Sequence, residues 1–210
     1  MSLETLPRSK SAGQKQLVLE NELDGVRNKL GQLTYITYAS RPDIRAKVGE
    51  SASAINKFKY EHVGMLNSVI DHAKTTCSEI GFAFNGSMNL DSVHFVLFVD
   101  GALGGSEGNS RLGTLLAVTD KFPSGLSHLA GWESKRLRRV VRSSLAAEIY
   151  AANEQTDYAN VVRNLYQDVL TGSLPLIVAT DCQSLFGHIR TNKTMAERIP
   201  QKPFFNFKKC

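Results

Sequence analysis

Three acidic residues, Asp100, Glu148 and Asp181, are the side chains of this sequence best suited to chemistry. Asp100 ends the apolar run 93–99, Asp181 ends the apolar run 174–180, and Glu148 lies near the start of a long helical pattern. Carboxylates are the oxygen ligands that hard divalent cations prefer, and many nucleases hold two such cations around a phosphate. The three acids therefore predict a Mg²⁺ (or Mn²⁺) site.

The predicted elements explain how these acids could meet. If the two apolar runs form parallel neighbouring strands, Asp100 and Asp181 end at the same edge of the sheet. Glu148 is three residues after Leu145 and four before Ala152, so it lies near the apolar stripe of its helix. Three carboxylates at one edge would repel each other, and a bound cation would relieve that repulsion.

Each acid also has an ordinary interpretation that the residues alone leave open. Asp100 precedes a glycine and suits a turn. Asp181 precedes a helical pattern and suits an N-cap. Glu148 could be a solvated helix residue.

The second half of the chain has the pattern of a mixed α/β domain. The predicted elements are strands over 93–99, 112–119 and 126–133, a helix that begins near Ser143 or Ser144 with an apolar stripe from Leu145 to Val169, a strand over 174–180 and a helix over 183–190. Short loops join the first three strands, which predicts an antiparallel meander. The long helix is then a crossover to the fourth strand. The predicted order is β-β-β-α-β-α.

The first part of the chain has a different pattern. Residues 1–16 are polar and are expected to form a disordered tail. Helical spacing of apolar residues begins near residue 17, and 60–73 is predicted to form one amphipathic helix. A loop over 84–92 is the expected boundary between a small helical segment and the α/β domain.

Composition excludes several classes of protein. The chain has 210 residues, of which 42% are hydrophobic, enough for a core. No apolar run is long enough to span a bilayer, so no membrane partner is expected. The three cysteines form no CxxC pair, which argues against a zinc site or a disulfide framework and favours an intracellular location, cytoplasmic or nuclear. A net charge of +5 is compatible with a polyanionic partner.

Five basic residues close together predict a nucleic-acid contact. They are Lys135, Arg136, Arg138, Arg139 and Arg142. Such a cluster suits a phosphate backbone, although it could equally be a solvated loop before the long helix. The glycine-rich stretch 101–108 is followed by a predicted strand rather than a helix, so no small-molecule cofactor is expected.

Four short motifs, three of which contain one of the acids, follow one another along the chain. They are Phe98-Val99-Asp100, Trp132-Glu133-Ser134-Lys135-Arg136, Ser143-Ser144-Leu145-Ala146-Ala147-Glu148 and Thr180-Asp181-Cys182-Gln183-Ser184, with Asn192 at a familiar distance. In this order they resemble the ribonuclease H domain of copia-type LTR retrotransposon polyproteins. Residues 30–76 resemble the end of the reverse transcriptase of the same polyproteins, through Leu33-Thr34-Tyr35-Ile36, Ser40-Arg41-Pro42-Asp43-Ile44 and Glu61-His62.

The resemblance implies a ribonuclease H-like mixed sheet, incomplete at the C-terminus. It implies that 17–84 is a reverse transcriptase remnant, 93–194 the ribonuclease H-like domain and 195–210 a divergent tail. It also implies hydrolysis of the RNA strand of RNA–DNA hybrids by two metals, with Asp100, Glu148 and Asp181 as catalytic metal ligands. Hybrids would be recognised through phosphates and 2′-hydroxyls, and the rest of the polyprotein is a further expected partner.

Departures from the family pattern bear on activity. The family continues into a fifth strand and a final helix that carries a fourth acid, but no aspartate follows Asp181 here. No Asp-Asp pair occurs in the sequence, so no polymerase activity is expected. The leading hypothesis is a ribonuclease H module. The alternative is a non-catalytic relic that binds nucleic acid, and a third, transposase-like or integrase-like nuclease fits the motifs less well.

Overall fold

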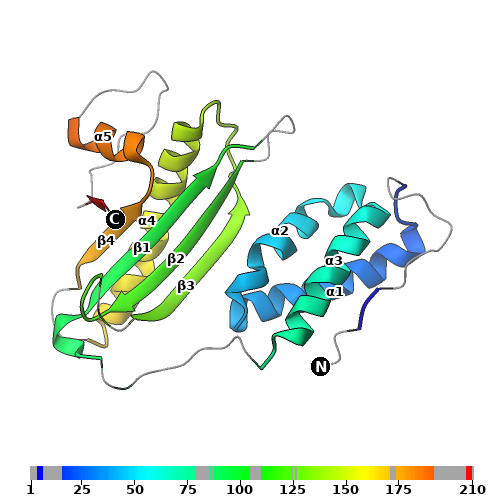
Figure 1. Ribbon diagram of the computed structural model, residues 1–210, viewed down its shortest axis with the longest axis horizontal. Helices are drawn as coiled ribbons and strands as arrows, with labels where there is room; N and C mark the ends of the chain where they lie inside the picture. The colour runs from blue at the N-terminus through cyan, green and yellow to red at the C-terminus, as the bar shows by residue number, and fades with distance from the viewer. Residues whose placement is uncertain are drawn as a thin grey trace. The chain divides into compact units, whose positions relative to one another are not determined.

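The computed structural model of the chain divides into two compact units, residues 1–83 and 84–210. It describes residues 4–6, 16–78, 86, 88–104, 110–123, 125, 127–170, 174–191 and 207–209. Each unit is considered by itself below (Figure 1). Within these described ranges, no helix is both long and apolar enough to cross a membrane.

The first unit is built from three helices. They are α1 (Glu20–Ala39), α2 (Arg45–Ser53) and α3 (Tyr60–Thr75), joined through 3₁₀ turns at Pro42–Ile44 and Ile55–Lys57. The helix predicted over 60–73 is confirmed as α3. Apolar residues from all three helices form one core, in which Leu33, Val48 and Leu66 are fully buried.

A short N-terminal segment is held against this unit by Asn67. The Leu6 backbone N–H donates to Asn67 Oδ1 over 2.8 Å, and Asn67 Nδ2 donates to the Leu6 carbonyl over 2.9 Å. The Leu6 side chain belongs to the helical core. The expected disordered tail over 1–16 is therefore wrong for residues 4–6, because one buried amide satisfies both backbone groups of Leu6. Residues 7–15 lie outside the described part of the chain.

Replacing Asn67 with Ala should destabilise the first unit by about 1–3 kcal/mol, because two buried backbone groups lose their partner. Native-state hydrogen exchange of the α3 amides measures this local stability. Asn28→Ala, at an exposed position of α1, is the matched control and should change stability by less than about 0.5 kcal/mol. Equal effects of the two substitutions would contradict a clamp at Asn67.

The second unit is an α/β domain with a mixed sheet. Its elements are β1 (His94–Ala102), β2 (Arg111–Thr119), β3 (Ser127–Arg136), α4 (Ser144–Gln167), β4 (Leu176–Thr180), α5 (Gln183–Thr191) and β5 (Phe207–Lys209), after a 3₁₀ turn at Leu90–Ser92. The strand order is β3-β2-β1-β4-β5. The first three strands are antiparallel, while β4 is parallel to β1 and β5 is parallel to β4. The predicted ribonuclease H-like order β-β-β-α-β-α is confirmed.

Two features of the strands differ from the sequence prediction. Residues 207–209 form a short edge strand that was not predicted, because three residues are too few to show a strand pattern. β1 continues to Ala102 instead of ending before Asp100, because β2 keeps pairing with it as far as Arg111. Asp100 therefore lies within a strand, opposite Gly113, and the turn interpretation is wrong.

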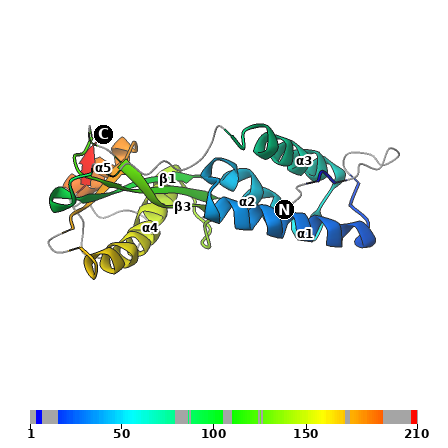
Figure 2. The ribbon, with the colours of Figure 1, turned by 90° about the horizontal axis from the view of Figure 1, so that it is seen from below.

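Helix α4 covers one face of the sheet (Figure 2). Its most buried residues include Ala146, Ala147 and Ala151, which pack in the same core as Phe95 and Leu97 of β1. These small side chains allow the helix to approach the sheet closely.

The predicted apolar stripe of this helix is only partly correct. Ala152, Thr156 and Ala159 are buried, but Val169 is 81% exposed. The reason is that α4 ends at Gln167, so the residues beyond it no longer follow the helical face. Gly172, the expected C-terminal stop, lies outside the described residues.

Candidate metal centre

The structure brings Asp100, Glu148 and Asp181 together. One carboxylate oxygen from each residue lies within 4.8 Å of the others. Asp100 and Asp181 are exposed, and Glu148 is half-buried. In the part of the chain that the structure describes, this is the group of acidic, histidine or cysteine side chains with a spacing suited to a metal ion.

The register of β1 and β4 places the two aspartates. Phe98 pairs with Ala179 in parallel register, and each aspartate follows its member of that pair by two residues. Because side chains alternate along extended backbone, Asp100 shares the face of Phe98. Asp181 comes one residue after β4 ends at Thr180. Asp100 and Asp181 therefore come side by side, as the parallel-neighbour interpretation of the sequence predicts.

Helix α4 brings the third carboxylate. Ser143 is its N-cap, and the Ser143 hydroxyl accepts a hydrogen bond from the Ala146 N–H over 3.1 Å. This cap determines where the helix begins. Glu148 follows Ser144 by four residues, a rise of about 6 Å along the helix axis. Its carboxylate thus lies at the N-terminal end of α4, where the helix meets β1.

The environment of Glu148 favours its protonated form. Burial raises its pKa from the ordinary 4.5 to about 7, and the negative charges of Asp100 and Asp181 add to the shift. A hydrogen bond from the Gly101 N–H to Glu148 Oε2, 3.1 Å long, acts in the opposite direction. The sequence did not point to Gly101, since a glycine after a strand is more often a turn residue. The signal available in the sequence was the pair Asp100-Gly101, in which the glycine directly follows a predicted metal ligand.

The three carboxylates suit a hard divalent cation. They offer several oxygen atoms, two of the three residues are open to solvent, and their mutual repulsion is the kind that a cation relieves. No thiol or imidazole belongs to the cluster, so its chemistry fits Mg²⁺ or Mn²⁺ better than softer metals.

Lys135, one of the five predicted nucleic-acid contacts, has other partners. Its ammonium group lies 2.8 Å from a carboxylate oxygen of Glu133 and 2.9 Å from one of Glu154. Glu133 also accepts a hydrogen bond from the buried Gln155 over 2.9 Å. These contacts join β3 to α4, and Lys135 neutralises two acids within the domain.

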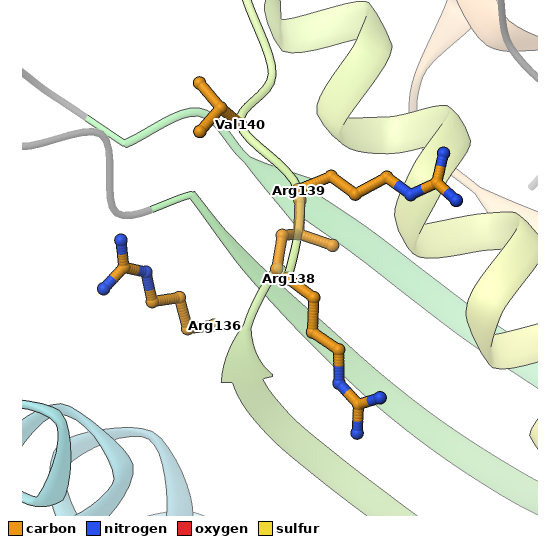
Figure 3. Close-up of a pocket in the computed structure, with 5 residues that line it drawn as sticks. Arg136, Arg138, Arg139 and Val140 are labelled. Atoms are coloured by element: carbon orange, nitrogen blue, oxygen red, sulfur yellow. The ribbon is translucent and has the colours of Figure 1, made fainter.

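The four arginines of the cluster are placed differently. All four are exposed: Arg136 is the last residue of β3, and Arg138, Arg139 and Arg142 lie on the segment between β3 and α4. The first three, with Leu137 and Val140, line a surface pocket of about 240 Å³. Their guanidinium groups extend in different directions, and that of Arg139 points toward α4 (Figure 3), where it lies 5.5 Å from the centre of the Tyr150 ring. Arginines spread in this way suit several phosphates along a backbone rather than one anion.

The solved structures that match this chain include one ribonuclease H1. It is described as the crystal structure of LC11-RNase H1 in complex with RNA/DNA hybrid, with 14% identity and a TM-score of 0.32. The match covers 49% of this chain and 65% of that protein. No family model matches the sequence, and no curated protein does.

The raised pKa of Glu148 predicts that metal binding releases a proton. Near pH 6 the carboxyl group is mostly protonated, so Mg²⁺ or Mn²⁺ binding should release about one proton per site, and near pH 8.5 almost none. Calorimetry in two buffers of different ionisation enthalpy measures this number. Glu148→Gln should release no proton at either pH. Equal release by the wild type at both pH values would show that Glu148 does not titrate with the metal.

Proposed function

We propose that residues 93–194 form a ribonuclease H-type nuclease module, which binds RNA–DNA hybrids and hydrolyses the RNA strand with the help of Mg²⁺. The observation that carries this proposal is the convergence of Asp100, Glu148 and Asp181 at one end of a ribonuclease H-like sheet. The exposed arginines before α4 support a nucleic-acid partner.

In this proposal the three acids hold the metal. When bound there, divalent cations would supply the positive charge that activates an attacking water and stabilises the leaving oxygen of the phosphate. Asp100 and Asp181 are exposed and so can face both solvent and substrate. Glu148 lies deeper and must lose its proton before it can act as a ligand, so activity should fall below about pH 7.

In this proposal the arginines hold the substrate close to these acids. Arg138, Arg139 and Arg142 lie on the segment that leads directly into α4, and Glu148 is in the first turns of that helix. A nucleic-acid strand bound along Arg138 and Arg139 would therefore lie near the N-terminal end of α4. Contacts to phosphates supply affinity without reading sequence, as expected for an enzyme that recognises the shape of a hybrid.

The second candidate is a non-catalytic relic that binds nucleic acid. It is favoured by the number of acids, because among the described residues the cluster has three members and no fourth. A weaker second metal site would follow. We also propose that residues 17–84 are the remnant of a reverse transcriptase in a retrotransposon polyprotein, without polymerase activity of their own.

The chain should cleave the RNA of an end-labelled RNA–DNA hybrid only slowly with Mg²⁺, and should leave duplex DNA and single strands intact. Asp100→Asn should reduce this rate by at least about 100-fold, because it removes a ligand of the metal that stabilises the charge developing at the reacting phosphate. Asp91→Asn, an exposed acid in the turn before β1, is the control and should have no effect. Hybrid binding without any cleavage would favour the relic, and cleavage that Asp100→Asn leaves intact would exclude this site.

Binding to hybrids should depend on salt through the arginines. Replacing Arg138 and Arg139 with Ala should reduce the slope of log affinity against log salt by up to about two units, because each phosphate contact contributes about one unit. The double variant Lys47→Ala with Lys57→Ala removes the same charge from exposed positions of the helical unit and should leave the slope unchanged. Identical slopes for all three proteins would show that the arginines are a solvated loop.

A further inference from the structure

Gly101 lies unusually close to the first turn of α4. A Cβ atom at this position would be 2.5 Å from the Ala147 carbonyl oxygen and 2.6 Å from both the Ala147 carbonyl carbon and the Glu148 nitrogen. All three are backbone atoms of a helix, so no rotation of a side chain can make room. Any other residue at position 101 must move α4 away from β1.

The same residue holds the carboxylate of Glu148. The Gly101 N–H donates to Glu148 Oε2 over 3.1 Å, and a hydrogen bond to a carboxylate is among the stronger kinds in proteins. Gly101 directly follows Asp100 in β1. One short piece of strand therefore carries one acid and fixes the position of a second.

We propose that Gly101 is the positioning residue of this site. Its missing side chain allows α4 to approach β1, and its N–H then orients the Glu148 carboxylate beside Asp100 and Asp181. Gly101 has no side chain with which to bind a metal or a substrate. The consequence for metal affinity rests on the proposed function, whereas the positioning of Glu148 does not.

Gly113 provides a matched comparison in the same sheet. It lies opposite Asp100 in β2, yet a Cβ atom there would meet nothing within 4 Å. An alanine at position 113 adds the same methyl group to a strand glycine that is paired with Asp100. The two glycines thus separate a general effect of alanine on the strand from the specific contact with α4.

The first experiment tests the hydrogen bond without any metal. In the ¹⁵N-labelled full chain, Glu148→Ala should move the Gly101 amide proton resonance upfield, because the N–H loses its acceptor. Asp168→Ala, at an exposed position at the C-terminal end of the same helix, should leave that resonance in place. A Gly101 amide resonance that does not respond to Glu148→Ala would overturn the proposal. Since this experiment keeps Gly101, it does not depend on whether a variant at that position folds.

The second experiment measures Mn²⁺ affinity. Gly101→Ala should weaken binding by about 10-fold or more, as for other residues that orient a ligand, while Gly113→Ala should change it by less than about twofold. In the Glu148→Gln background, Gly101→Ala should have almost no further effect, because its role passes through Glu148. Additive losses, or equal losses from both glycines, would overturn the proposal.

The two experiments distinguish this inference from the proposed function. If the wild-type chain binds no Mn²⁺, the metal centre is excluded, and the amide resonance alone decides whether Gly101 positions Glu148. If Mn²⁺ binds but the resonance does not respond, the metal centre stands and the role of Gly101 is refuted.

Discussion

The parallel pairing of β1 with β4 is the interaction on which the candidate site depends. It aligns Phe98 with Ala179 and so brings Asp100 and Asp181 side by side two residues later. A shift of one residue in this register would turn one aspartate to the other face of the sheet. The crossover helix α4 makes the parallel pairing possible and also delivers Glu148 to the same place.

The site also carries an electrostatic cost. Glu148 is half-buried near two other carboxylates, and its pKa rises from 4.5 to about 7. Because the folded state binds this proton more tightly than the unfolded chain, the stability that protonation contributes is lost as pH rises from about 4.5 to about 7. A bound cation would relieve the repulsion, so the domain gives up some stability to keep three acids together.

The cluster of five basic residues within 135–142 contains both paired and exposed cations. Lys135 joins β3 to α4 through Glu133 and Glu154, while the arginines that follow remain exposed. The difference arises from position, since Lys135 lies within β3 on the side of α4 and Arg138 and Arg139 lie beyond the end of the strand. The number of basic residues in a stretch of sequence does not show which of them form ion pairs within the domain, because paired and exposed side chains carry the same charge.

The sequence by itself was enough to predict the order of the elements from β1 to α5 and to select Asp100, Glu148 and Asp181 as candidate metal ligands. Apolar periodicity and short motifs, on which these predictions rest, are local properties of the chain. The sequence also located the start of α4 at Ser143 or Ser144, and the structure shows that Ser143 is the cap. Tertiary structure decided what depends on distant neighbours. The pairing with β2 extends β1 past Asp100, Asn67 holds Leu6, and Glu133 with Glu154 takes up Lys135. The close contact of Gly101 with α4 belongs to the same group, because two segments 47 residues apart meet there only after the sheet and helix have packed.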